Sequence, residues 1–545
     1  MEFHSYSSKC PFKSVDDIKN KKITVMGLGL NGGGLAAVRF FLKKGAFVTV
    51  TDMKTEEQLK SSVDALKNDA ELPQEKLIFH LGEHILSDFE NADCVIKNPG
   101  VKYQGNKFLA VAKAIETDLS IFLRFTSAPI IAVTGSKGKS STVSAIYYGL
   151  KTAGFKTFLG GNITVSPLTF FDEVNQDTPV VIEFSSWQLA DLRGRGILKP
   201  HISIITKIVP DHQNWYGNME DYVADKRLIY KNQDKGCYSI FDADGDEPGT
   251  GPEKSAHPEL DNSTWGNLFA SESHATVLRY GKSEKSLENC HSGAENSRST
   301  DNEQSAPAKV YGVWQEKDKN GRTIGKLFLP YMEKPVTVMK ELSVPGEHMK
   351  TNVLNAALVM NLMGIDAEKC AEICGKWSGI EHRLQYFHSW KCKKTEYKFY
   401  NDSCATVPEA AAAATQAFEK SVNLITGGTD KGLELLPLAR ILTAPQNSEY
   451  KVKSIYLLAG SATDKILPVL QKNKTEYYGP FNSLDELLCE MKKNLEDEEK
   501  SKENSAKNSE IVVFSPGATS FGMFANEFDR GEKYMNAVKK LFVEN

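Results

Sequence analysis

The 545-residue sequence lacks the features that mark membrane, secreted and nucleic-acid-binding chains. No apolar run reaches the roughly 18 residues of a membrane span, and the N-terminus has no apolar signal core. We therefore expect a cytoplasmic protein that does not bind a membrane. Lysine and arginine (66) nearly balance aspartate and glutamate (70), and no basic tract dominates. Nucleic acid is therefore not an expected partner.

Paired cysteines are absent too. The nine cysteines stand singly, without a CxxC pair, which argues against a disulfide framework or a zinc site. With 41% hydrophobic and 25% charged residues, the rest of the composition is that of an ordinary soluble chain. Its length suffices for roughly three or four domains, so the motifs must indicate the function.

The motif around which the chain is organised runs from Pro129 to Val143, PIIAVTGSKGKSSTV. Residues 130–133 predict a buried strand, and a helix is expected from Ser140. Between them, Gly135 and Gly138 allow the backbone to curl with its N–H groups inward, next to the positive potential of a helix N-terminus. This order predicts a phosphate-binding loop, although a glycine turn also occurs in α/β proteins that bind no nucleotide.

Side chains of the same turn favour ATP. Lys139 can place a point charge on terminal phosphates, and a hydroxyl of Ser140 or Ser141 can ligate Mg²⁺. Val133 stands where the eight-residue Walker pattern has its first glycine, so the motif is the shorter T-G-x-x-G-K-S form.

Two candidate metal-binding or catalytic positions follow. Residues 179–184 (PVVIEF) predict a buried strand with Glu183 near its carboxyl end, a position typical of a Mg²⁺ ligand or a base. The alternative is a carboxylate that caps the amides that follow. The strand predicted at 201–208 leads to Asp211 and His212, where the aspartate could equally cap the next helix.

A lysine lies on the apolar face of the helix predicted at about 218–231. Lys226 is four residues from both Tyr222 and Tyr230, so it points the same way as the aromatic rings. Either it snorkels to solvent, which spacing alone favours, or it is held as a functional group whose pKa burial would lower.

Residues 22–52 predict a compact βαβ unit of the dinucleotide-binding kind. Gly27, Gly29 and Gly32 form G-x-G-x-x-G, and Asp52 follows Gly32 at the spacing of a ribose-binding acid. A tight packing turn is the alternative. An NAD-dependent oxidoreductase would explain this unit but leave the second glycine loop unused, whereas an enzyme that joins a nucleotide-carrying substrate to ATP chemistry uses both.

The remaining chain continues the α/β pattern. Polar residues at about 244–308 predict surface insertions. Strand–loop–helix alternation from about Gly379 predicts a further parallel sheet, whose loops carry Asp402, Lys431, Ser520 and Arg530.

Taken together, these motifs resemble those of the Mur ligases of peptidoglycan synthesis. The stretches that carry the resemblance span nearly the whole chain in the family's order: GLGLNG, AVTGSKGKSS, GGN, IEFSSWQL, VPDHQNWYG, DYVADKRLIY, PGEHMKTN, GIEHR, YNDSCAT, GGTDKG, SPGATSFGMF and DRG. The resemblance implies three α/β domains: a Rossmann-like UDP-substrate-binding domain (1–117), a central P-loop ATPase domain (118–379) and a C-terminal Rossmann-like amino-acid domain (380–545).

The N-terminal unit points to the D-glutamate-adding branch of the family. The resemblance then implies a monomeric ligase that joins D-glutamate to UDP-N-acetylmuramoyl-L-alanine for cell-wall synthesis. ATP would phosphorylate the L-alanyl carboxylate, and the amine of glutamate would attack the acyl phosphate, giving an amide, ADP and phosphate. The same chemistry with L-glutamate or another amino acid is an alternative, as is a non-catalytic, ligand-sensing relative.

Site residues carry over by position. Catalysis would use Lys139, Glu183, His212 and Lys226. Two Mg²⁺ ions would be held by Ser140, Glu183, His212 and Lys226, the lysine being carbamylated by CO₂. ATP would contact Gly135, Ser136, Lys137, Gly138, Lys139, Ser140, Ser141, Asn352, Arg383 and Asp402. The UDP substrate would contact Leu30, Asn31, Asp52 and Asn162, and glutamate would contact Thr406, Lys431, Ser520 and Phe521.

Five positions depart from the family pattern. Cys404 replaces a lysine after Asp-Ser, so one cation expected near glutamate or phosphate is missing. Lys137, Lys207 and Met349 stand in place of asparagines, and Gly522 in place of an aspartate. The changes leave the ATP and Mg²⁺ residues intact and bear mainly on amino-acid specificity.

Overall fold

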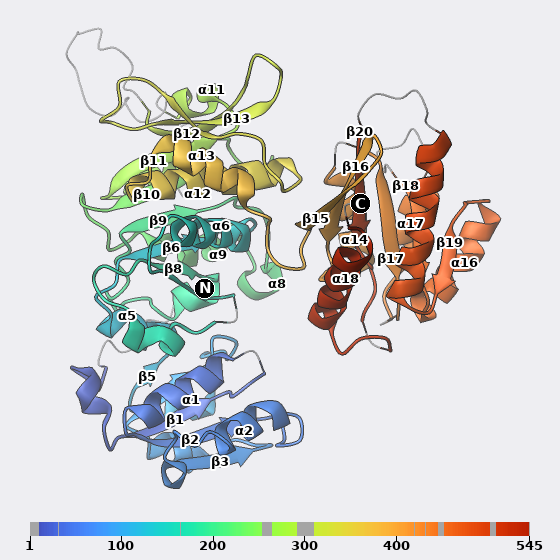
Figure 1. Cartoon of the computed structure of the whole chain (residues 1–545). Coiled ribbons are helices and arrows are strands. Elements are labelled where there is room, and N and C mark those ends of the chain that lie inside the picture. Colours follow the sequence, from blue (N-terminus) through green and yellow to red (C-terminus); the bar gives the residue numbers. More distant parts are fainter. Residues whose placement is uncertain are drawn as a thin grey trace. The chain divides into compact units, whose positions relative to one another are not determined.

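A computed structural model describes residues 10–30, 32–163, 165–252, 264–290, 310–418, 420–430, 432–444, 452–501, 508–520 and 522–543. It forms two compact units, Met1–Glu341 with Thr351–Cys374 and Leu342–Lys350 with Gly375–Asn545, which are described separately (Figure 1). Three sheets interleaved with helices confirm the predicted α/β class. The predicted site residues Asn31, Lys431 and Phe521 lie outside the described residues.

The first sheet of the first unit is fully parallel and has the order β3-β2-β1-β4-β5. Its strands are β1 (Lys22–Met26), β2 (Phe47–Asp52), β3 (Leu77–Leu81), β4 (Cys94–Lys97) and β5 (Ile115–Glu116); its helices are α1 (Gly33–Lys43), α2 (Lys60–Lys67), α3 (Leu86–Glu90) and α4 (Lys107–Ala110). Gly32, with φ +85°, immediately precedes α1 in the left-handed conformation that glycine favours. The predicted βαβ unit is therefore confirmed.

The second sheet of this unit has nine strands in the order β14-β13-β12-β11-β10-β9-β6-β8-β7, with antiparallel pairing only at β12-β13-β14. The strands are β6 (Ile130–Thr134), β7 (Phe158–Gly161), β8 (Val180–Glu183), β9 (Ile202–Ile205), β10 (Tyr238–Asp242), β11 (Thr276–Gly281), β12 (Gly312–Lys317), β13 (Thr323–Phe328) and β14 (Val336–Met339). Because β6 lies between β8 and β9, the loops after these three strands meet at one edge.

Helices surround the central sheet in Figure 1. They are α5 (Asp118–Phe125), α6 (Lys139–Thr152), α7 (Ser186–Ala190), α8 (Gln213–Tyr216), α9 (Met219–Lys226), α10 (Trp265–Glu272), α11 (Glu284–Glu288), α12 (Glu347–Leu362) and α13 (Ala367–Lys376). The helix predicted at 218–231 is shorter than expected, since α9 ends at Lys226 and a 3-10 turn, Arg227–Ile229, follows.

The predicted polar insertion at 244–308 is wrong for its middle part. Residues 264–290 contain α10, β11 and α11, and β11 is an interior strand paired with β10 and β12. Trp265, Phe269 and Leu278 are buried there. The polar flanks dominate the average composition and conceal this short apolar element. Residues 253–263 and 291–309 lie outside the described residues.

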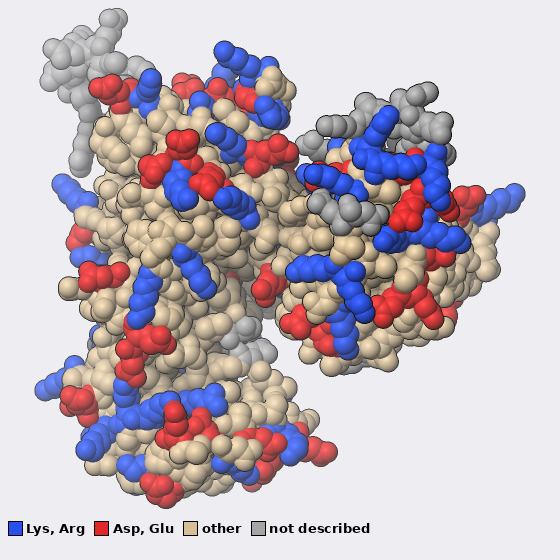
Figure 2. Space-filling model, viewed as in Figure 1, with Lys and Arg blue, Asp and Glu red and all other residues tan. Residues whose placement is uncertain are grey.

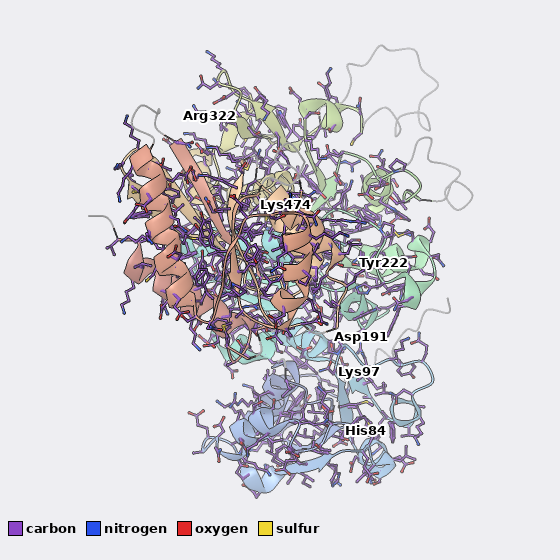
Figure 3. All side chains as sticks on the ribbon, turned by 90° about the vertical axis from the view of Figure 1, so that its right-hand side faces the viewer. His84, Lys97, Asp191, Tyr222, Arg322 and Lys474 are labelled. Carbon is purple, nitrogen blue, oxygen red and sulfur yellow. The ribbon has the colours of Figure 1, made fainter. Side chains whose placement is uncertain are left out.

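Buried ion pairs join the two sheets of the first unit. Lys97, the last residue of β4, pairs with Asp191 after α7 at 2.9 Å, and both side chains are more than 90% buried. Figure 3 labels these two residues near the middle of this unit. Glu116 pairs with Arg195 at 2.8 Å and with Arg124 at 3.2 Å. The predicted boundary at residue 117 therefore falls within one compact unit and stays a proposal.

The second unit has one six-stranded sheet of order β15-β16-β20-β17-β18-β19, parallel except for the β15–β16 hairpin. Its strands are β15 (Gln385–Cys392), β16 (Thr395–Asn401), β17 (Val422–Gly427), β18 (Val452–Leu458), β19 (Tyr478–Phe481) and β20 (Asn508–Phe514). Helices cover both faces, with α17 (Leu484–Ser501) and α18 (Glu527–Leu541) on one and α14 (Pro408–Gln416), α15 (Leu436–Leu442) and α16 (Ser461–Lys472) on the other.

Basic and acidic side chains are interspersed over the face of the molecule drawn in Figure 2. All nine cysteines carry free thiols. Within the ranges that the structure describes, no helix combines the length and the apolar character needed to cross a membrane.

Candidate active site

Neighbouring atoms leave no room for a side chain at two glycine positions of the P-loop. Gly135 has φ +144°, and a Cβ atom there would lie 2.0 Å from Oγ1 of Thr206, which follows β9. Gly138 has φ +91°, and its Cβ would lie 2.5 Å from Oδ1 of Asn352 on α12. Larger residues are excluded from both positions. The contact also places Asn352, predicted to bind ATP, directly against the loop.

Two amides of the loop do not point where the sequence predicts. The N–H groups of Ser136 and Lys137 both donate to the carbonyl of Lys207, at 2.9 and 3.2 Å, because the chain after β9 lies against the turn. The Ser136 hydroxyl also has partners within the protein. It donates to the Val209 carbonyl and accepts hydrogen bonds from the Val209 amide and the Tyr222 hydroxyl. The expectation that the whole loop turns its N–H groups inward is therefore corrected. Amides in the first turn of α6 have no intrahelical acceptor and keep their anion-binding potential.

Lys139 is folded back over its own turn. Its Nζ donates to the carbonyls of Gly135 and Ser136, at 3.0 and 2.9 Å. Burial lowers the pKa of Lys139, whereas Glu183 and Asp211 oppose that shift. The ammonium group thus lies at the loop, and its hydrogen-bond acceptors among the described residues are two backbone oxygens, which a phosphate could replace.

Lys226 does not snorkel. The residue is 2% exposed, its Nζ donates to the Gly135 carbonyl at 2.8 Å, and it lies 4.4 Å from the centre of the Tyr222 ring. Burial, and next the positive charge of Lys139, hold the pKa of Lys226 well below its ordinary value. A buried amine with a lowered pKa is the neutral form that can act as a nucleophile.

Glu183 ends β8 as predicted and is 1% exposed. Its Oε1 accepts a 2.9 Å hydrogen bond from Nδ2 of Asn162, whereas Oε2 is buried and makes no hydrogen bond with the described residues. The alternative role as a cap is wrong, since Ser185 bonds Gln188 instead. Asn162, predicted to lie nearer the sugar, orients this carboxylate. An unpartnered buried carboxylate oxygen fits a cation ligand.

His212 follows β9 in a group of aromatic residues. Its ring centroid lies 4.9 Å from that of Trp187 and 6.3 Å from that of Tyr222, and its side chain is 43% exposed. Trp187 also contacts Trp215, at 5.1 Å. The sequence analysis did not predict these ring contacts or the hydrogen bond from the Tyr222 hydroxyl to Ser136. The available signal was that Tyr222 lies on the same helical face as Lys226.

A metal ion fits these residues in part. Among the residues that the structure describes, no group of three or more His, Cys, Asp or Glu side chains forms a ready metal site. Glu183 offers one unpartnered oxygen, and His212 an exposed ring. A third ligand would have to come from the Ser140 hydroxyl, from substrate or from a modified Lys226.

The N-terminal sheet has its own small hollow at the carboxyl ends of β1 and β4. Gly27, Gly34 and Asn98 are among its lining residues. Asp52 lies at the end of β2, where its Oδ2 accepts from the Gly29 amide at 3.1 Å, and Leu30 is 53% exposed. A glycine-lined hollow at the switch point of a parallel sheet is where nucleotides bind.

In the second unit, the loops after β16, β17 and β20 meet. Asp402 accepts from the Ser515 hydroxyl and the Leu384 amide, at 2.6 and 3.1 Å, and burial raises its pKa to about 7. Arg383 is exposed, and Thr406 is partly buried. Ser520 lines a small hollow, together with Gly428, Thr519 and Arg530, that the sequence alone does not indicate.

Together, a Rossmann-like sheet, a P-loop-type turn with a buried lysine beside it, and a further α/β unit define a multidomain nucleotide-dependent enzyme. Two family descriptions match the chain: "Mur ligase MurD-like, N-terminal domain" at residues 21–121 and "Mur ligase middle domain" at residues 133–360.

Named relatives match over almost their whole length. A UDP-N-acetylmuramoylalanine–D-glutamate ligase of Treponema pallidum is 37% identical, over 96% of this chain and 98% of its own. One of Borreliella burgdorferi is 35% identical, over 97% and 99%. Among solved structures, UDP-N-acetylmuramate-alanine ligase MurC of Thermotoga maritima aligns at 17% identity over 96% and 100%, with a TM-score of 0.48. The chain therefore belongs to the Mur ligase family, which comprises ATP-dependent amide-bond-forming ligases.

Proposed function

We propose that this Mur ligase joins D-glutamate to UDP-N-acetylmuramoyl-L-alanine in an ATP-dependent step of peptidoglycan synthesis. The two relatives described above carry this activity in their names and align over nearly the full chain. The observation that carries the chemistry is the buried Lys226 amine, 2.8 Å from the P-loop carbonyl of Gly135, with Glu183 ending the strand next to β6.

A carboxylate must be activated before an amine can attack it. An oxygen of the L-alanyl carboxylate attacks the γ-phosphorus of ATP, the bond to the bridging oxygen breaks, and ADP leaves. The D-glutamate amine then attacks the acyl carbon, loses a proton and expels phosphate. Lys139 and the first-turn amides of α6 would hold the phosphates, and their positive charge lowers the repulsion between two anions.

Mg²⁺ is the cation that best suits this donor set, with two ions expected from the resemblance. Bound Mg²⁺ neutralises phosphate charge and withdraws electrons from the transferred group. Ser140, Glu183 and His212 would hold it, together with Lys226 once its neutral amine has added to CO₂ and released a proton. Asn162 keeps Glu183 oriented by its hydrogen bond to Oε1.

The other predicted contacts remain part of the proposal. Asn352 and the loop Gly135–Ser141 would hold ATP, with Arg383 and Asp402 from the second unit. Leu30, Asn31 and Asp52 would hold the UDP part. Thr406, Lys431, Ser520 and Phe521 would form the glutamate pocket. The boundaries at residues 117 and 379, a cytoplasmic location and a monomeric state belong to the same proposal.

Phosphate release tests the function. The purified chain, ATP, Mg²⁺ and UDP-N-acetylmuramoyl-L-alanine are incubated with D-glutamate, L-glutamate and a panel of other amino acids. We expect turnover that depends on D-glutamate, and loss of turnover in Lys226→Ala but not in the exposed neighbour Lys231→Ala. Equal or faster turnover with another amino acid would show the alternative specificity, and amino-acid-independent hydrolysis would refute the ligase assignment.

Lys226 carbamylation has a direct test. With ¹³C-labelled bicarbonate we expect a carbamate resonance in the wild type that is absent from Lys226→Ala. Activity that survives strict CO₂ removal would contradict the modification and leave the ligase assignment standing.

A further inference from the structure

A buried arginine in the second unit takes no part in the function described so far. Arg530 lies in the first half of α18 and is 1% exposed. Its Nε donates to the Ser403 hydroxyl at 3.0 Å, and Nη2 and Nη1 donate to the carbonyls of Ser403 and Ala518 at 2.7 and 3.0 Å. It therefore holds together the loops that follow two neighbouring strands, β16 and β20.

The charge of Arg530 is not balanced by these contacts. All three acceptors are neutral, and among the described residues no carboxylate lies within ion-pair distance of the guanidinium. Burial lowers the pKa of Arg530 to about 10, so the group stays charged at neutral pH. A buried cation without an anion is costly, and a guanidinium has five N–H donors, so two remain after these three hydrogen bonds.

The same side chain lines the small hollow described above. Of the described residues around this hollow, Arg530 is the one with a positive charge; the others include Gly428, Thr519 and Ser520. A Cβ atom on Gly428, whose φ is +135°, would lie 3.0 Å from the Thr519 carbonyl, so this wall stays free of side chains. This small hollow thus combines a permanent cation with hydroxyl groups, the partners that a carboxylate oxygen requires.

Cys404 makes this charge more important. It stands where the family pattern has a lysine, and its thiol lies within electrostatic reach of both Arg383 and Arg530. Burial raises the pKa of the Cys404 thiol, so that the group is neutral at pH 7. The cation lost at this position is therefore not replaced by the residue that stands there.

We propose that Arg530 supplies the positive charge with which this hollow binds a carboxylate of the incoming amino acid. The inference rests on the proposed ligase function and adds a residue that determines specificity. A carboxylate would take the two remaining N–H groups, whereas the existing bonds to Ser403 and Ala518 keep the guanidinium plane fixed.

Steady-state kinetics of Arg530→Gln and Arg530→Lys test the proposal. In Arg530→Gln we expect the KM for D-glutamate to rise at least about tenfold, while the KM values for ATP and the UDP substrate stay within about twofold. Arg530→Lys keeps the positive charge but lacks the planar guanidinium, so its KM for D-glutamate should lie between those of the wild type and Arg530→Gln. Lys540→Gln, an exposed charge loss on the same helix, is the matched control and should change nothing. An unchanged KM for D-glutamate, or a parallel rise of all three KM values, would overturn the proposal.

A second measurement needs no stable Arg530→Gln protein. In the wild type with the UDP substrate and a non-hydrolysable ATP analogue, D-glutamate should shift the Arg530 guanidinium ¹⁵N resonances, assigned through Arg530→Lys, and butylamine should not. No shift with D-glutamate overturns the proposal. A wild type that shows this shift but no D-glutamate-dependent turnover would refute the proposed function and leave the carboxylate site standing.

Discussion

Each unit of this Mur ligase has a buried basic side chain at its candidate site that donates to backbone carbonyls, but the two groups differ in chemistry. Lys226 donates to the Gly135 carbonyl, and burial with the neighbouring Lys139 holds its pKa well below normal. Arg530 donates to the Ser403 and Ala518 carbonyls, and burial lowers its pKa only to about 10. Burial of this kind thus favours the neutral form of a lysine amine, whereas it leaves an arginine charged.

This difference matches the tasks proposed for the two sites. An amine that has lost its proton can form a bond to carbon, and the P-loop site needs such a group if Lys226 is to become a metal ligand. A permanent cation can only attract an anion, which suffices for holding a carboxylate. The choice between lysine and arginine therefore decides between a reactive and a binding group.

Exchanging the buried lysine in the first unit should have the largest effect. Lys226→Arg replaces an amine that can lose its proton with a permanent cation that cannot react with CO₂, so we expect phosphate release to fall at least about 1000-fold. Arg530→Lys, the reciprocal change, should retain most of kcat. Comparable kcat losses in the two variants would break the distinction between the sites.

The buried acid of the second unit gives a pH test. Burial raises the pKa of Asp402 to about 7, from 3.8 in the unfolded chain, so the folded protein binds the extra proton between these values. Stability contributed by this group is present below about pH 4 and is lost as the pH rises to about 7. Asp402→Asn can make both hydrogen bonds without titrating.

Thermal unfolding of the ligand-free proteins between pH 4 and 8 measures this effect. The free energy of unfolding of Asp402→Asn, relative to that of the wild type, should rise by about 3 to 4 kcal/mol between about pH 4 and pH 7 and stay constant above about pH 7. The exposed Asp464→Asn on α16 is the control and should give a pH-independent difference. A flat difference for Asp402→Asn would show that its carboxyl is ionised throughout.

The glycine that holds Lys226 in place is a third test. Gly135→Ala would put a Cβ 2.0 Å from Thr206 Oγ1, in a backbone conformation with φ +144°. We expect about 3 kcal/mol of destabilisation from overpacking and strain. Gly154→Ala shares the positive φ, +97°, but meets no atom within 4 Å, and should cost about 1 kcal/mol. Equal decreases in thermal midpoint for Gly135→Ala and Gly154→Ala would show that the P-loop accommodates the added methyl group without strain.

The hydrogen bond from the Tyr222 hydroxyl to Ser136 should make the smallest of these contributions to stability. Tyr222→Phe keeps the ring beside Lys226 but removes the 3.0 Å hydrogen bond to Ser136, so we expect a loss of about 1 kcal/mol in stability and little change in kcat. Tyr478→Phe, partly exposed in the other unit, should change stability by less than about 0.3 kcal/mol. A large kcat loss in Tyr222→Phe would assign the hydroxyl a role in orienting the loop for catalysis.

Much of the fold follows from local sequence patterns. Apolar runs bounded by glycine turns predicted β6 and β8 to within two residues, and the βαβ unit at 22–52 that contains β1 and β2, because strand length and turn chemistry are local properties. The element that was missed, β11, is six residues long and lies between polar segments that dominate any composition average. Its place in the sheet depends on partners from distant parts of the chain.

The candidate site shows the same division. Residue type and order indicated the P-loop, Glu183 and His212, and the family resemblance indicated Lys226. Spacing alone favoured the wrong environment for Lys226, since a snorkelling and a buried lysine have identical positions on a helix. The hydrogen bonds from the Ser136 and Lys137 amides to the Lys207 carbonyl could not be predicted from the sequence, because almost every residue type has the same backbone donor and acceptor.

By itself, the sequence determined the order of strand, glycine turn and helix, the family, and the residue types available at each loop. Only the tertiary structure decided which of those groups are charged and what they face. Lys226 and Gly135 are 91 positions apart, and Arg530 and Ser403 are 127 apart. Burial and contacts between such distant residues set the pKa of each group, so the folded chain favours the neutral amine of Lys226 and leaves Arg530 a cation.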